Sequence, residues 1–143
     1  MANQRYKIYK IENNLTACWT TPEAMQAWFD WIVKTKWWKE RSKIKHVKVI
    51  FPVVGKMSGA FKEAPHLARI EFGVFSLCQQ TACHELAHVL AWPGDDTTPE
   101  EDHGPKFVAM YLQVVKRFMS AEEAKLLQRE FDDRGVKYTG GGI

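Results

Sequence analysis

Residues 76–92 read SLCQQTACHELAHVLAW, and the order of polar and apolar residues in this segment is that of a helix. Side chains four residues apart lie on the same side of an α-helix, so His84 and His88 share one face. The opposite face carries the apolar residues Ala82, Leu86, Val89 and Leu90. The sequence therefore predicts a helix that packs against a core on one side and presents two imidazoles to a cleft on the other.

The two histidines can present ring nitrogens to one metal ion, and a third imidazole follows them. His103 comes fifteen residues after His88, at the start of the segment HGPKF. Zinc in hydrolytic enzymes usually takes three protein ligands and leaves a fourth position to water. Glu85 lies about 100° around the helix from His84, where its carboxylate can reach that water without binding the ion. These residues predict one Zn²⁺ held by the three histidines, with Glu85 as the general base of a hydrolase.

Other ligand sets and other metals stay open at this point. A metzincin would carry glycine and histidine at fixed steps after the first motif, but Ala91 and Gly94 stand there, which excludes that class. Imidazole ligands also suit iron, copper and nickel. Cys83 points about 100° away from His84, so core packing is favoured over metal binding. A glutamate could replace His103, although helix-start positions explain the candidates better; these are Glu100, Glu101, Glu122 and Glu123.

The HELAH segment followed by HGPKF resembles the SprT-like zinc metalloproteases, whose signature is HExxH and then HGPxF at this separation. It also resembles small predicted metallohydrolases of phages and actinobacteria. The resemblance covers residues 84–107 and implies a compact zincin-like fold, zinc binding by the three histidines and catalysis by Glu85. It further implies cleavage of peptide bonds, including those of proteins crosslinked to DNA. Many members add a CxxC…CxxC zinc ribbon, which this chain lacks, since its cysteines are Cys18, Cys78 and Cys83.

Patterns along the rest of the chain predict an α+β fold, in which a small sheet packs against helices and the motif helix is central. Strands are expected at 5–11, 47–53 and 68–73, with a loop at 55–65 between the last two. Helices are expected from Pro22 to about Lys39, from Pro105 through Phe118, and from a cap at Ser120 to near Gly135. For the motif helix, we expect Ser76 and Gln79 to form the N-terminal capping box.

Three further residues are candidates for contact with a substrate or its transition state. In zincin-like folds a strand at the sheet edge pairs with an extended substrate, and the strand at 68–73, directly upstream of the motif helix, is the candidate here. His66 and Arg69 would then lie near the metal, where His66 could donate a hydrogen bond to an oxyanion. Tyr111 is a second candidate donor, although its helical register favours core packing.

Positive charge is concentrated between residues 34 and 48, where seven Lys or Arg residues accompany one Glu in a chain of net charge +3. Trp37 and Trp38 lie among them. Basic and aromatic side chains together suit phosphates and stacked bases, so DNA is a candidate partner. A solvated helix end that leads into a lysine-protected strand is the simpler explanation. The candidate anion-binding residues are Lys34, Lys36, Lys39, Arg41, Lys43 and Lys45.

The length of 143 residues, 45% of them hydrophobic, suffices for one domain with its own core. We therefore expect a single catalytic domain over residues 1–143, with a flexible tail at about 138–143. No segment approaches the roughly 18 apolar residues of a membrane span. The N-terminus lacks an apolar run and the cysteines are odd in number, which together predict a cytoplasmic, unsecreted protein that does not engage a membrane.

Taken together, these features predict a zinc metallopeptidase that acts on a protein or peptide. A zinc hydrolase of another substrate class stays open, because zinc-activated water attacks other carbonyl and phosphoryl groups as well. A non-catalytic zinc-containing module that binds DNA or protein also stays open. The position of Glu85 beside His84 argues against the module, because a structural zinc site needs no base.

Overall fold

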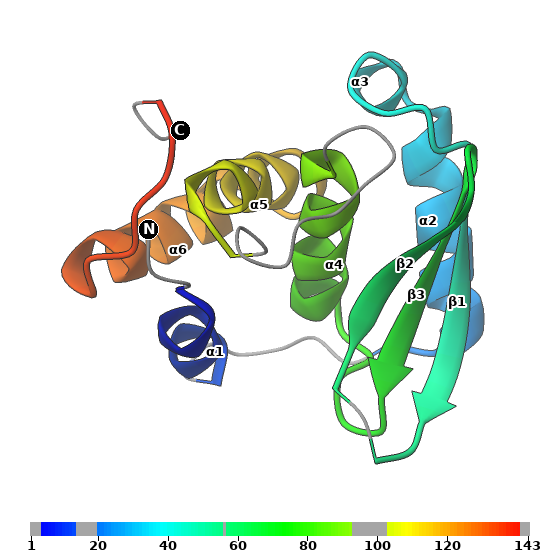
Figure 1. The fold of residues 1–143 in the computed structure, drawn as a ribbon, viewed down its shortest axis with the longest axis horizontal. Coiled ribbons are helices and arrows are strands. Elements are labelled where there is room, and N and C mark those ends of the chain that lie inside the picture. Colours follow the sequence, from blue (N-terminus) through cyan, green and yellow to red (C-terminus); the bar gives the residue numbers. More distant parts are fainter. Residues whose placement is uncertain (1–3, 14–19, 56, 93–102, 141–143) are drawn as a thin grey trace. The chain divides into compact units, whose positions relative to one another are not determined.

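Figure 1 shows the fold in a computed structural model that describes residues 4–13, 20–55, 57–92 and 103–140. Within these ranges the protein has six helices and a three-stranded mixed sheet, which confirms the α+β architecture. Contacts divide the chain into two compact units. One unit runs from residue 17 to residue 90, and the other combines residues 1–16 with residues 91–143. The single domain expected from composition stays a prediction.

The unit of residues 17–90 contains the sheet, which consists of β1 (His46–Val53), β2 (Gly59–Ala64) and β3 (Leu67–Gly73) in the order β1-β3-β2. The central strand, β3, pairs in parallel with β1 and antiparallel with β2. Successive side chains of a strand point to opposite faces, so one face of β3 is fully buried through Ala68, Ile70 and Phe72. The alternating patterns thus predicted β1 and β3 correctly.

Two predictions about the sheet are wrong. Residues 59–64, expected within a loop, form β2, although their sequence GAFKEA has no apolar alternation that would indicate a strand. The last four of these residues are exposed, so backbone pairing with β3 and not burial accounts for the strand. The second error concerns β3, which was expected at the sheet edge. Both of its edges are occupied, so β3 has no free edge at which an extended substrate could pair.

The helix α2 (Pro22–Lys34) packs on β1 (Figure 1). Its start is the predicted one, because proline occupies the first turn and the Thr21 hydroxyl accepts a hydrogen bond from the Ala24 N–H at 3.1 Å. The side chains that α2 buries are spaced for one helical face and consist of Met25, Phe29, Ile32 and Val33.

The expected continuation of this helix to Lys39 is wrong at one residue. Thr35 is extended and separates α2 from the short α3 (Lys36–Lys39). The Thr35 hydroxyl donates to the Ile32 carbonyl at 2.7 Å and accepts from the Trp38 N–H at 3.2 Å. One hydroxyl therefore closes the first helix and caps the second, which is the competition with the helical backbone expected of threonine.

A side chain from α2 covers the outer edge of β1. The Gln26 amide donates to the Val47 carbonyl at 2.7 Å and accepts from the Val49 N–H at 2.9 Å. A neighbouring strand would make the same pair of bonds, so one glutamine satisfies this part of the edge. The bonds also remove a template for pairing with another chain.

The predicted motif helix is present as α4 (Gln79–Ala91). It buries polar as well as apolar side chains, including those of His84 and Glu85. The helix begins at Gln79, so the capping box expected from Ser76 is wrong. The Ser76 hydroxyl instead donates to the Gly73 carbonyl at 3.0 Å and lies 2.5 Å from the Ser58 hydroxyl, which holds the turn that leaves β3.

The second unit consists of α1 (Arg5–Asn13), α5 (Pro105–Phe118), α6 (Ala121–Asp133) and the segment that follows α6. Residues 5–11 were expected to form a strand, and this prediction is wrong. Ile8 and Ile11 are both fully buried and stand three residues apart, a spacing that places them on one face of a helix. The weak two-residue alternation of this segment suggested a strand, whereas the spacing of its buried isoleucines is helical.

The predicted ends of α5 and α6 are confirmed. Pro105 occupies the first turn of α5. The Ser120 hydroxyl accepts from the Glu123 N–H at 3.0 Å and caps α6. At the other end of α6, Gly135 has a φ of +68°, a conformation that glycine adopts without strain. The Val136 N–H donates to the Phe131 carbonyl at 2.8 Å, which completes a Schellman-type ending.

Residues at the start of the predicted flexible tail make hydrogen bonds, and the flexibility of the tail stays a prediction. The Tyr138 hydroxyl donates to the Asp132 carboxylate at 2.7 Å, and the Thr139 N–H donates to the Pro105 carbonyl at 3.2 Å. These bonds connect the segment after α6 to both α6 and the beginning of α5. Residues 141–143 lie outside the described residues.

Replacing Gln26 tests whether its amide stabilises the sheet edge. Gln26→Leu keeps the helix and much of the side-chain volume but removes both bonds to β1. We expect the free energy of unfolding to fall by about 2 kcal/mol, since two backbone groups lose their partners. Urea unfolding followed by tryptophan fluorescence measures this. Lys34→Leu, at an exposed position of the same helix, is the control and should change the value by less than about 0.5 kcal/mol. Equal midpoints for Gln26→Leu and the wild type would contradict the assignment.

Candidate metal centre

His84 and His88 lie one turn apart on α4, as the sequence predicts. Their ring centroids are 5.0 Å apart and the ring planes are inclined at 66°. His84 is buried and His88 is partly exposed. Because one rigid helix carries both side chains, little backbone ordering is needed to bring their nitrogens to a common ion.

His103 is held in a different way, because it precedes a helix. It is followed by Gly104, the N-cap of α5, and by Pro105 in the first turn. Its ring makes edge contacts with Phe107, at a centroid distance of 5.0 Å, and with Tyr9 of α1, at 5.6 Å. Only 2% of His103 is exposed. Aromatic neighbours therefore enclose an imidazole that the helix itself does not fix.

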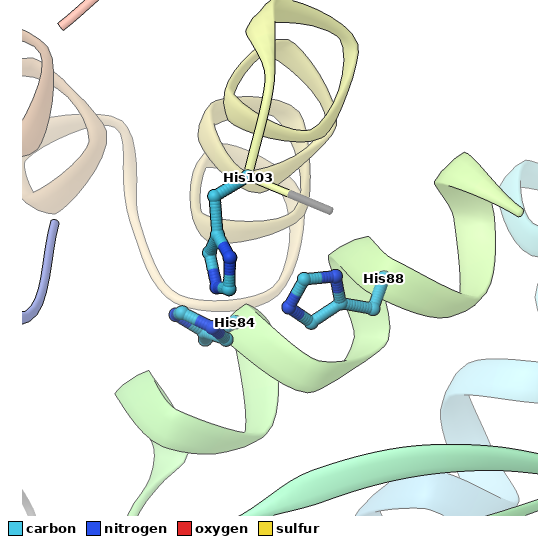
Figure 2. Close-up of side chains that lie close together, drawn as sticks. All are labelled: His84, His88 and His103. Carbon is cyan, nitrogen blue, oxygen red and sulfur yellow. The ribbon is translucent and has the colours of Figure 1, made fainter. Parts of the chain in front are cut away.

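The rings of the three histidines converge (Figure 2). One ligand atom of each, from His84, His88 and His103, lies within 4.8 Å of the other two. This is the one group of three or more His, Cys, Asp or Glu side chains close enough to hold a metal ion among the described residues. The three histidines that the two motifs predict as ligands therefore lie close together in the structure.

The donor set fits a transition metal. Imidazole nitrogens bind zinc at about 2.0–2.1 Å, which separates two of them by about 3.4 Å in tetrahedral geometry. The ligand atoms of the three histidines lie within 4.8 Å of one another, so rotation of the side chains can bring them to this separation. Three neutral nitrogen donors also suit iron, copper and nickel, so the geometry leaves the identity of the metal open.

Glu85 follows His84 on α4 and is 4% exposed. Its Oε1 lies 3.7 Å from His84 Nε2. Removing a carboxylate from water costs several kcal/mol unless charge or hydrogen bonds compensate it. Glu85 is not a member of the three-histidine group. A buried carboxylate thus lies beside the cluster without belonging to it.

Cys83 lies in the core, as the sequence analysis favoured. Its side chain is fully buried, and burial raises the pKa of its thiol well above the ordinary value, with a smaller contribution from Cys78. The thiolate is the form that binds metals, so the raised pKa works against ligation. Cys18 lies outside the described residues.

The additional substrate-contact candidates all make other interactions. His66 is exposed in the turn between β2 and β3, and its Nδ1 lies 2.8 Å from the Lys43 carbonyl oxygen. The Arg69 guanidinium donates to two carboxylates, those of Glu63 at 2.7 Å and Glu71 at 2.8 Å. The hydrogen bond from Arg69 lowers the pKa of the Glu63 carboxyl. These interactions do not support a catalytic role for either residue.

Tyr111 is fully buried in α5, where its ring packs between those of Phe107 and Phe131. Its hydroxyl donates to the Glu12 carboxylate at 2.7 Å and so connects α5 to α1. The core packing that its register favours is therefore observed, and its role as an oxyanion donor has no support from these contacts.

The basic segment 34–48 presents all of its charges to solvent, since each of its seven Lys and Arg side chains is exposed. The two tryptophans of this segment differ in exposure. Trp38 is fully buried and donates from Nε1 to the Ile44 carbonyl at 2.8 Å. Trp37 is partly exposed, and the Arg41 guanidinium stacks 4.1 Å above its ring. One tryptophan of the pair is thus partly exposed and the other is buried.

Comparisons with protein-family models, with curated proteins and with solved structures found no match for this chain. None of the helices in the described ranges combines the length and the apolar character needed to cross a membrane. Two alternative ligands from the sequence analysis, Glu122 and Glu123, lie in the first turn of α6 and are not part of the histidine cluster. The other two, Glu100 and Glu101, lie outside the described residues.

Sequence reasoning missed two residues that contact His103. The Gln4 amide donates to the His103 carbonyl oxygen at 3.3 Å, and Tyr9 packs against the ring. Gln4 and His103 are 99 positions apart, and neither Gln4 nor Tyr9 belongs to a motif. The burial of a polar glutamine near the chain end is the signal that could have identified it, and burial is seen only in the folded structure.

The five histidines of the chain provide a test of the centre with internal controls. We expect His84→Ala, His88→Ala and His103→Ala each to weaken zinc binding by more than about a hundredfold, because losing a ligand costs more than losing a residue that supports one. His46→Ala and His66→Ala, both exposed, should bind as the wild type does. Zinc content after dialysis and competition with a chromophoric chelator measure this. Full zinc content in His103→Ala would remove that residue from the centre.

Proposed function

We propose that the protein is a zinc-dependent peptidase, cytoplasmic and with a zincin-like catalytic core, in which His84, His88 and His103 hold one zinc ion and Glu85 is the general base. One observation carries this proposal: a buried carboxylate adjoins a cluster of three imidazoles without being part of it. Three ligands leave a coordination position for water, as catalytic zinc sites require. The resemblance of the two motifs to SprT-like metalloproteases supports the same reaction class.

The three histidines and Glu85 would have separate roles in amide hydrolysis. His84, His88 and His103 would hold the zinc ion, which when bound would supply a Lewis acid and a water acidic enough to lose a proton near neutral pH. The Glu85 carboxylate would accept a proton from the water that attacks the amide carbonyl, and would later return it to the departing amine. The burial of Glu85 keeps bulk water from competing for the proton, which favours transfer along this route.

The two alternatives from the sequence differ from this proposal in what they require. A structural zinc module needs a fourth protein ligand, and the described residues contribute three to the cluster. A hydrolase of a non-peptide substrate would use the same four residues, so the substrate must be tested directly. We favour the peptidase because the paired motifs occur together in a family of proteases.

Replacing Glu85 by glutamine separates metal binding from catalysis. Glu85→Gln retains the shape of the side chain but cannot accept a proton. We expect the rate of casein or fluorogenic-peptide hydrolysis to fall by about a hundredfold or more, whereas one zinc per chain is retained. Glu122→Gln, exposed in the first turn of α6, should match the wild type in both measurements. Wild-type rates in Glu85→Gln would contradict its role as the base.

An anionic partner, with DNA as the candidate, is the second part of the proposal. Seven exposed basic side chains accompany a single acidic residue, Glu40, in residues 34–48. That acidic residue lies 3.7 Å from Lys36 and 3.8 Å from Arg41, and such exposed pairs contribute little. The partly exposed Trp37, with the Arg41 guanidinium over its ring, adds an aromatic side chain of the kind that stacks with bases. A surface of this kind would place the peptidase near proteins that are bound to DNA.

The salt dependence of DNA binding tests this partner. We expect the triple variant Lys36→Ala/Lys39→Ala/Arg41→Ala to bind DNA more weakly than the wild type. The slope of log affinity against log salt should become shallower by about 1 for each basic side chain that no longer pairs with a phosphate, or about 3 in total. The control is Lys116→Ala/Arg117→Ala/Lys125→Ala, an exposed set of the same charge on α5 and α6. Equal slopes for both variants in fluorescence anisotropy would rule out a specific role for segment 34–48.

A further inference from the structure

Gln4 stands immediately before α1, is 6% exposed and makes three hydrogen bonds to the backbone. Its Oε1 accepts from the Lys137 N–H, and its Nε2 donates to the Lys137 carbonyl at 2.9 Å. The same Nε2 donates to the His103 carbonyl oxygen at 3.3 Å. One buried amide therefore joins the start of α1, the segment after α6 and the residue before the N-cap of α5, all within the same compact unit.

The pair of bonds to Lys137 has a counterpart elsewhere in the chain. Gln26 also uses its amide to accept from one backbone N–H and to donate to one backbone carbonyl, at the edge of β1. Both glutamines imitate a neighbouring strand. The two differ in the partner of the third bond, which Gln26 donates to the Asp30 carboxylate at 3.0 Å and Gln4 donates to the backbone carbonyl of His103. Comparing the two residues therefore separates the loss of backbone bonds in general from the loss of a bond to a proposed metal ligand.

The bond to His103 acts where the chain lacks regular backbone support. His103 precedes the N-cap of α5, so helical hydrogen bonds do not fix its φ and ψ angles. Fixing an otherwise free residue costs conformational entropy, and a ligand that is ordered only when metal binds lowers the affinity by that amount. The hydrogen bond to the His103 carbonyl orders this residue without the metal, as do the edge contacts of Tyr9 and Phe107 with its ring. The entropy that metal binding must still remove is therefore smaller.

We propose that Gln4 is a positioning residue for the metal centre, which holds the backbone of His103 in the ligating conformation through its side-chain amide. Tyr9 supports the same residue from the ring side. This inference rests on the proposed role of His103 as a zinc ligand. It assigns a function in the centre to the first residues of the chain, which contribute no ligand themselves.

The first measurement compares the two glutamines. Gln4→Leu should weaken zinc binding by about tenfold, the effect typical of a residue that supports a ligand. Gln26→Leu removes two equivalent backbone bonds in the other unit and should change zinc affinity by less than about twofold. Competition with a chromophoric chelator measures both. Equal affinities for Gln4→Leu and Gln26→Leu would overturn the proposal.

A double-mutant cycle separates positioning from a general loss of structure. In the His103→Ala background the ligand is absent, so Gln4→Leu should have no further effect on the residual zinc affinity. If the tenfold effect persists in that background, Gln4 acts on the protein as a whole and the proposal fails. Should Gln4→Leu not fold, Gln4→Glu takes its place, since it keeps an acceptor for the Lys137 N–H and loses the donor to the carbonyl oxygens of Lys137 and His103.

A metal-free measurement keeps this inference distinguishable from the proposed function. The imidazole C–H signals of His103, assigned by their absence in His103→Ala, should shift or broaden in Gln4→Leu and stay unchanged in Gln26→Leu. Failure of the wild type to bind zinc, with this shift present, would defeat the proposed function but retain the role of Gln4 in placing the ring. An unchanged His103 signal in Gln4→Leu would overturn the positioning role whatever the zinc result.

Discussion

The burial of polar side chains is the constraint on which the structure around the cluster depends. His84, Glu85 and His103 are each at most 5% exposed, and groups of this kind lose hydration worth several kcal/mol when they leave water. A chain of this size has only about 5–15 kcal/mol of net stability, so such a loss must be offset locally. A cation shared by the imidazoles, with the carboxylate beside it, would offset it in one step.

The same constraint explains why glutamine side chains appear at two places where strands would otherwise be needed. Gln26 satisfies the edge of β1, and Gln4 satisfies Lys137 and supports His103. Each amide provides one donor group and one acceptor, so a single side chain can meet both kinds of backbone group. The backbone groups at the edge of β1 and at Lys137 therefore have hydrogen-bond partners without an additional strand beside them.

The sequence predicted those features whose signal is local. The helical spacing of residues 79–91, the helix start at Pro105 and the cap at Ser120 each depend on residues within about one or two turns, and each is confirmed. The nearness of His103 to the two α4 histidines came from motif chemistry, since no local pattern contains it.

The features that the sequence failed to predict depend on distant partners. β2 is a strand because β3 lies beside it, and its own residues GAFKEA do not indicate one. α1 was mistaken for a strand because only tertiary burial shows that Ile8 and Ile11 belong to one face. The hydrogen bond between Gln4 and His103 spans 99 positions, beyond the reach of any periodicity. Local physics thus located the motif helix, whereas long-range contacts determined its surroundings.

The three histidines are unequal in how they are fixed, and this inequality bears on how the centre would respond to its metal. A continuous helix sets the backbone of His84 and His88 whether or not an ion is present. His103 depends on the N-terminus of α5, on two aromatic neighbours and on one glutamine. The ordering cost of the centre therefore falls mainly on the third ligand. Changes in the contacts of His103 should accordingly alter metal affinity more than equal changes in the contacts that hold α4.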